Sequence, residues 1–103
     1  MIVEYIRYKL PVENCATFES DYARAAHSLA ESPYCIGYEL SHCSDEPGVY
    51  VLRIRWTSAD DHMQGFRHSA QFPPFLAAIR PYVSQIEEMR HYKLTHIVGG
   101  KVD

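Results

Sequence analysis

The alternation of two hydrophobic periodicities along this chain limits its fold more than any other feature. Apolar side chains at every second residue are typical of a half-buried β-strand, and apolar side chains every three or four residues are typical of one face of an α-helix. Strands are predicted over residues 2–10, 36–42, 49–56 and 83–94, and helices over residues 14–30, 60–69 and 72–80. If the last two helical segments are counted as one connection, the order is β-α-β-β-α-β.

Local signals set the ends of these elements. Pro33 disfavours the helical conformation of the residue before it and so ends the first helix. The segment from Ser44 to Gly48 has the composition of a turn, which predicts that the two central strands form a hairpin. Ser58 and Asp61 have the spacing of a capping box. The predicted fold class is α+β: a ferredoxin-like βαββαβ arrangement with a four-stranded antiparallel sheet and helices on one face.

The length of 103 residues fits a single domain. We expect the domain to cover residues 1–95 and a C-terminal tail to cover residues 96–103, where Gly99 and Gly100 favour a loose conformation.

Composition excludes several function classes. The net charge of −3 and the absence of adjacent basic residues argue against nucleic acid as a partner. The N-terminal segment MIVEYIRYKLP contains Glu4 and Arg7, so it predicts neither a signal peptide nor a membrane span. Three cysteines without a C-x-x-C pair favour reduced thiols. These features together predict a soluble cytoplasmic protein.

The sheet face away from the helices is predicted to be unusually apolar. Val49 and Val51 alternate onto this face of their strand, and Val3 and Tyr5 match them in the first strand. A bare apolar face favours a covering partner. A second copy of the chain is the simplest cover, so we expect a homodimer joined sheet to sheet.

The segment from Trp56 to Tyr82 is rich in aromatic residues. An exposed helix has no need for Phe66, Phe72 and Phe75 at such close spacing. These side chains therefore either fill a core or line the apolar wall of a small-molecule pocket.

The same segment carries a resemblance to a known family. Its pattern W-T-S-x-x-x-H-x-x-x-F-x-x-S-x-x-F-x-x-F, the strand Ile36 to Leu40 and the βαββαβ order are similar to the antibiotic biosynthesis monooxygenase domain of the dimeric α/β-barrel superfamily. The resemblance covers Met1 to Leu94. It implies a dimeric α/β barrel with a pocket between helices and sheet in each subunit. It also implies oxidation of phenolic or quinol-type aromatic compounds with O2, without flavin, haem or metal.

A related branch of the superfamily degrades haem and uses an Asn in the first strand, a helical Trp and an iron-ligating His. By alignment these positions fall on Ile6, Phe66 and Leu76. All three functional residues are absent, so haem degradation is disfavoured.

The alignment gives Phe66 a place facing the pocket, and residues three and four positions before it share its helix face. These residues are Met63 and His62. With an ordinary pKa of about 6.5, His62 is a candidate general base for a phenolic proton. The alternative is a partly exposed histidine without a chemical role. His68 is expected to project away from this face.

Three tyrosines, Tyr8, Tyr38 and Tyr50, are predicted on the helix-facing side of their strands. One of them is expected to orient a hydroxylated ring or hold an oxyanion, with Tyr8 and Tyr38 as catalytic candidates. Tyrosine also packs well on a pleated sheet, so a purely structural role is an equal alternative. The expected substrate-binding residues are Trp56, Phe66, Phe72, Phe75, Met63 and Tyr50.

No metal site is expected. His91 and His96 would need the tail to fold back, and no carboxylate or cysteine stands at a supporting spacing. Glu87 and Glu88 are neighbours in a strand, so they point to opposite faces and cannot act as an acid–base pair. No nucleotide-binding motif occurs.

The sequence thus favours a cofactor-independent monooxygenase that oxidises a small phenolic or quinol-like compound with O2. A non-catalytic role is the alternative, either binding a hydrophobic ligand or serving as an accessory dimerisation domain. A third hypothesis is a different enzyme on the same barrel, such as an isomerase or a haem-handling protein.

Overall fold

The computed structural model describes residues 1–101. Val102 and Asp103, at the end of the predicted tail, lie outside the described residues. The main elements are β1 (Ile2–Lys9), α1 (Cys15–Glu31), β2 (Cys35–His42), β3 (Val49–Trp56), α2 (Phe72–Ile79) and β4 (Ile86–Lys93).

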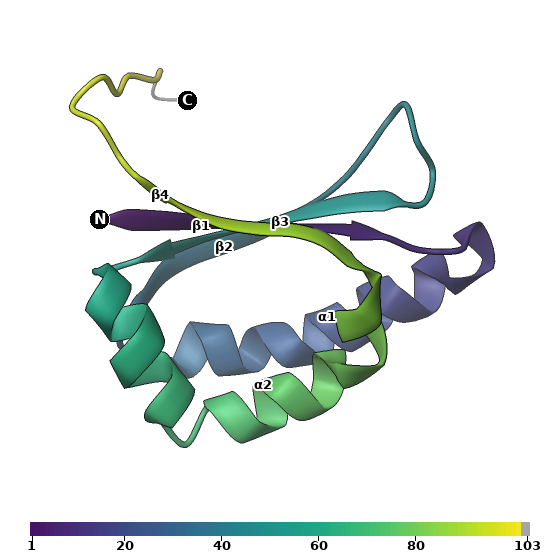
Figure 1. Cartoon of the computed structure of the whole chain (residues 1–103), viewed down its shortest axis with the longest axis horizontal. Coiled ribbons are helices and arrows are strands. Elements are labelled where there is room, and N and C mark those ends of the chain that lie inside the picture. The colour runs from purple at the N-terminus through teal and green to yellow at the C-terminus, as the bar shows by residue number, and fades with distance from the viewer. Residues whose placement is uncertain (102–103) are drawn as a thin grey trace.

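The four strands form one sheet in the order β2-β3-β1-β4, and all neighbouring strands are antiparallel. Helices α1 and α2 lie together on one face of the sheet, and in the described part of the chain the other face has no helix over it (Figure 1). This is the ferredoxin-like α+β arrangement, so the predicted fold class is confirmed. Within residues 1–101, no helix combines the length and the apolar character needed to cross a membrane.

The connection between β3 and α2 is less regular than predicted. The expected helix over residues 60–69 contains a π-helical turn, Asp61–Gly65, followed by a 3-10 turn, Phe66–His68. The last strand also begins later than predicted, because a 3-10 helix occupies Arg80–Gln85. Pro81 sets the start of that helix, where its missing N–H costs nothing.

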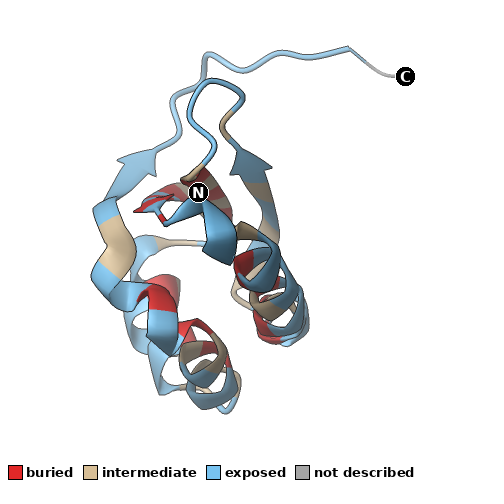
Figure 2. Cartoon of the chain, turned by 90° about the vertical axis from the view of Figure 1, so that its right-hand side faces the viewer, coloured by how far each residue is buried: buried red, intermediate tan, exposed pale blue. Residues whose placement is uncertain are grey.

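The core lies between the helices and the sheet, where Figure 2 shows the buried residues. Phe18 of α1 is fully buried and contacts three tyrosine rings from β1, β3 and the 3-10 helix, at centroid distances of 4.9 to 5.0 Å. Aromatic packing of this kind holds α1 against the sheet. The aromatic residues of the segment after β3 complete the core beneath the rest of the helical layer.

The predicted capping interaction at Ser58 is present. Its Oγ accepts a hydrogen bond of 3.0 Å from the backbone N–H of Asp61. We expect Ser58→Ala to lower the free energy of unfolding by about 1 kcal/mol, because the first turn loses its side-chain acceptor. Urea unfolding followed by circular dichroism measures this change. Ser58→Asp, which keeps an acceptor, is the matched control; equal stability of all three proteins would contradict a capping role.

Candidate active site

A cavity of about 240 Å³ lies between the helical layer and the sheet. Its aromatic wall is formed by Trp56, Phe66, Phe72 and Phe75. Aliphatic residues of the sheet and of α2 complete the apolar lining, and Glu4, Tyr8, His62 and Arg67 supply polar groups. The cavity is therefore apolar over most of its surface and has a polar end where Glu4 and His62 meet, 3.5 Å apart.

The aromatic residues after β3 pack on one another as well as lining this cavity. Phe66 is only 2% exposed and contacts Trp56, Phe72 and Phe75, with ring centroids 5.0, 5.6 and 5.4 Å away. The sequence left two alternatives for these rings, a core or a pocket wall. In the structure the rings pack on one another and also border the cavity.

His62 lies at the polar end of the cavity and is 4% exposed. Its imidazole ring stacks on the Trp56 indole, with centroids 4.6 Å apart and an interplanar angle of 22°. Nδ1 of His62 lies 2.8 Å from Nε2 of His91 on β4, a hydrogen bond in which either nitrogen can carry the hydrogen. His62 is therefore a buried, oriented group and differs from the partly exposed histidine of the alternative interpretation.

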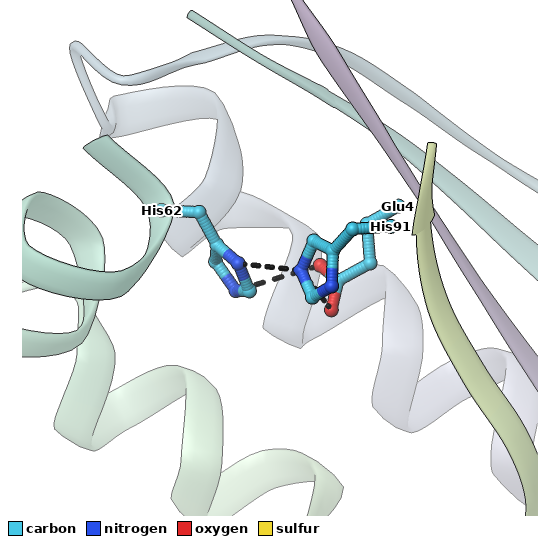
Figure 3. Close-up of side chains that lie close together, drawn as sticks. All are labelled: Glu4, His62 and His91. Atoms are coloured by element: carbon cyan, nitrogen blue, oxygen red, sulfur yellow. Dashed lines mark hydrogen bonds and ion pairs between the residues drawn. The ribbon is translucent and has the colours of Figure 1, made fainter. Parts of the chain in front are cut away.

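Glu4 joins these two histidines from β1 and is 2% exposed (Figure 3). Its Oε1 accepts a 3.1 Å hydrogen bond from Nε1–H of Trp56 and lies 3.5 Å from Nε2 of His62. Its Oε2 lies 3.5 Å from Nε2 of His91. Glu4 and His91 are direct partners in the β1–β4 pairing, so both side chains point to the same face of the sheet.

Burial shifts the protonation of this cluster. The loss of solvent raises the pKa of Glu4, although the Trp56 hydrogen bond and the positive charges of His91 and Arg67 oppose the shift. Burial lowers the pKa of His62 to about 4, and the positive charges of His91 and Arg67 act in the same direction. At neutral pH, His62 is accordingly an uncharged imidazole.

The tyrosine candidates are placed differently from one another. Tyr8 lines the cavity, but its hydroxyl is hydrogen-bonded to the hydroxyl of Tyr22, and burial raises the pKa of Tyr8 to about 12. Tyr50 is buried away from the cavity with its hydroxyl on Glu19. Tyr38 pairs with an inward-facing residue of β3, yet it is 37% exposed because β2 is an edge strand.

The expectation that Met63 shares the cavity-facing side with His62 and Phe66 is wrong. Met63 is 41% exposed and does not line the cavity. The reason is the π-helical turn, whose i→i+5 hydrogen bonds widen the helix and keep residues 62 and 66 in line while residue 63 rotates outward. His68 is exposed, as predicted.

The statement that no carboxylate supports His91 is also wrong. Glu4, His62 and His91 each bring one possible ligand atom to within 4.8 Å of the others. The spacing of these residues along the chain did not predict the cluster, because its members come from the first strand, the irregular helix and the last strand. A signal was present in the sequence: Glu4 occupies an inward position of a strand whose other inward residues, Ile6 and Tyr8, are apolar.

Comparison with known proteins places this fold and cavity in a family. The family model for the antibiotic biosynthesis monooxygenase domain matches residues 1–92. The α+β architecture is that of a ferredoxin-like protein. The match to the family model is more specific, and it shows that the chain belongs to the antibiotic biosynthesis monooxygenase family.

Individual relatives agree with this assignment. The uncharacterised Bacillus subtilis protein YczJ is 26% identical over 76 residues, which is 74% of this chain and 80% of YczJ. The crystal structure of a Bordetella bronchiseptica protein named for the same family has a TM-score of 0.75 and 25% identity, and the match covers 91% of this chain and 96% of that one. SnoaB, a cofactor-independent oxygenase from Streptomyces nogalater, has a TM-score of 0.76 at 22% identity, with 96% and 97% covered, and this likeness shows the fold.

Proposed function

We propose that the protein is a monooxygenase that oxidises a small phenolic or quinol-like aromatic compound with O2 in the cavity beneath the sheet. The observation that carries this proposal is a buried imidazole, His62, at the polar end of an otherwise mostly apolar cavity. Membership of the antibiotic biosynthesis monooxygenase family supports it.

In this proposal His62 removes the phenolic proton. A neutral imidazole is the form that can accept a proton, and the stacked indole of Trp56 holds the ring in place. The carboxylate of Glu4, 3.5 Å from His62, then stabilises the imidazolium that forms. His91 contacts both Glu4 and His62 and its side chain is 34% exposed, so it connects the buried base to solvent.

The electron-rich anion that results is able to react with O2 directly. A quinol-like compound carries the required electrons and hydrogen atoms itself. One oxygen atom can therefore enter at a ring C–H carbon, while the hydrogen of that carbon and the phenolic hydrogen leave with the other oxygen atom as water, which gives a quinone. This chemistry needs no flavin, haem or metal, and the structural neighbour SnoaB is described as a cofactor-independent oxygenase.

The size of the cavity limits the proposed substrate. At about 240 Å³ it exceeds the space that holds one benzene ring, which is about 150 Å³ in an engineered protein cavity. We therefore propose compounds with one or two fused rings.

Oxygen uptake tests the proposed function. Tag-free protein is mixed with a panel of hydroquinones and naphthols in an oxygen electrode, and the products are analysed by mass spectrometry after reaction under ¹⁸O2. We expect protein-dependent uptake and one ¹⁸O atom in the product. Saturable quenching of Trp56 fluorescence without oxygen uptake would contradict catalysis and indicate a ligand-binding protein.

We also propose that the protein is a homodimer joined through the uncovered sheet face. A hollow of about 600 Å³ on this face is lined by apolar and aromatic side chains, among them Val3, Tyr5, Val51 and Tyr92, and by charged residues around them. Among these charged residues, Arg53 pairs with Glu39 of its own chain at 2.8 Å. The free cysteines Cys15, Cys35 and Cys43 support a reducing location such as the cytoplasm.

Tyr92→Asp tests the dimer. Tyr92 is 47% exposed and packs edge-on against Tyr5 at 5.4 Å, so a carboxylate there would be desolvated by a partner sheet. We expect the wild type to be a dimer at micromolar concentration and Tyr92→Asp to be a monomer by light scattering. Val12→Asp, which replaces another exposed apolar residue away from the sheet, should stay dimeric. A monomeric wild type would contradict the proposal.

A further inference from the structure

We propose that Glu4, His62 and His91 form a binding site for a divalent transition-metal ion at the polar end of the cavity. One carboxylate and two imidazoles converge from β1, the π-helical turn and β4 (Figure 3). Two histidines and one carboxylate form a donor set that binds Zn²⁺ and Fe²⁺ in many proteins.

The spacing of the donor atoms fits an ion of this size. Zinc lies about 2.0–2.2 Å from nitrogen and oxygen ligands, so two ligands of a tetrahedral ion are about 3.4 Å apart. Nε2 of His62 lies 3.5 Å from Oε1 of Glu4, and Nε2 of His91 lies 3.5 Å from Oε2 of Glu4. His91 Nε2 also lies 2.8 Å from the other ring nitrogen of His62, Nδ1, so Nε2 is the His62 nitrogen that is measured against Glu4. One possible ligand atom from each of the three residues lies within 4.8 Å of the others, so modest side-chain shifts would bring all three to one ion.

The surroundings of Glu4 favour a cation. Its side chain is only 3% exposed, and among residues 1–101 the indole N–H of Trp56, at 3.1 Å, is its one hydrogen-bond donor apart from the histidines. A buried carboxylate is costly without a positive partner. The Trp56 hydrogen bond also orients the carboxylate, as partners behind a metal ligand commonly do.

The site has both an entry path and an open position. The His91 side chain is 34% exposed, so an ion can reach the cluster from solvent. Glu4 and His62 also line the cavity, which leaves a coordination position of the ion directed toward a bound compound. Three protein ligands and one open position are typical of metal sites that contact a substrate.

Metal binding and the base function of His62 exclude each other. An imidazole lone pair that ligates an ion cannot accept a phenolic proton at the same nitrogen. Occupation of the site would therefore inhibit the proposed oxidation, and this consequence alone rests on the proposed function.

Calorimetry tests the site without any substrate. Tag-free, chelator-treated protein is titrated with Zn²⁺, and the visible absorption of bound Co²⁺ reports the ligand geometry. We expect one ion per chain, with affinity lowered by about tenfold or more in both Glu4→Gln and His91→Ala. His96→Ala is the matched control, because His96 lies in the exposed tail just beyond β4, and it should bind as the wild type does.

Absence of stoichiometric binding by the wild type would overturn the metal site, as would equal affinity in wild type and His91→Ala. Neither result affects the proposed oxidation, which is measured separately by oxygen uptake in the presence of chelator. If Zn²⁺ binds and suppresses oxygen uptake, this supports the inference that His62 cannot ligate a metal ion and act as the base at the same time. If uptake instead requires an added metal ion, the metal site stands and the metal-free oxidation fails.

Discussion

His62→Ala lowers the turnover number for oxidation of a phenolic substrate by about 10²- to 10⁴-fold, which is the usual contribution of a positioned general base. The Michaelis constant should change little, because the aromatic wall of the cavity is untouched. The measurement is initial oxygen uptake at saturating substrate, with chelator present throughout so that a bound metal ion cannot account for the loss.

Two further measurements separate a chemical role from a structural one. Circular dichroism and thermal unfolding establish that His62→Ala is folded, since removal of a buried ring also leaves a void. Added imidazole should restore part of the turnover, because a free base can occupy that void. His68→Ala is the matched control, as His68 is exposed on the same segment. Unchanged turnover in His62→Ala would remove His62 as the base.

The fold was predictable from the sequence because its signals are local. Alternation in Val49 to Trp56 identifies a central strand, and the 3-to-4-residue spacing in α1 identifies a helix, whatever the rest of the chain does. The hairpin turn and Pro33 then leave few ways to connect the elements. Strand ends were less accurate where a short 3-10 helix precedes β4, since one proline does not reveal which helix type follows it.

The site was only partly predictable because its contacts join distant parts of the chain. His62 and the aromatic wall belong to one continuous segment, and a helical alignment placed them together. Glu4 and His91 meet only through the register of β1 and β4, which no spacing along the sequence reveals. Met63 was misplaced for a local reason: a π-helical turn has no clear sequence signature, and one widened turn rotates a side chain from the cavity to the surface.

Leu76→Trp should lower the specificity constant for the oxidised compound by about 100-fold. Leu76 lines the cavity from α2, and the larger indole would occupy the space proposed for the aromatic ring. Loss of the burial of a ring-sized apolar group costs about 2–3 kcal/mol, which corresponds to roughly 30- to 160-fold in affinity. The measurement is oxygen uptake over a range of substrate concentrations, together with calorimetry of an unreactive methyl ether of the same phenol.

Ala77→Trp is the matched control for the cavity, because Ala77 is the next residue on α2 and is exposed. An indole at this position points away from the cavity, so affinity and turnover should stay near the wild-type values. Both variants introduce a tryptophan side chain into the same helix. The difference between their affinities for the methyl ether therefore isolates the effect of filling the cavity. Equal affinity of the methyl ether for Leu76→Trp and Ala77→Trp would show that the compound binds elsewhere. A selective loss in Leu76→Trp, combined with the loss of turnover in His62→Ala, would locate the aromatic ring and its phenolic proton at opposite ends of the same cavity.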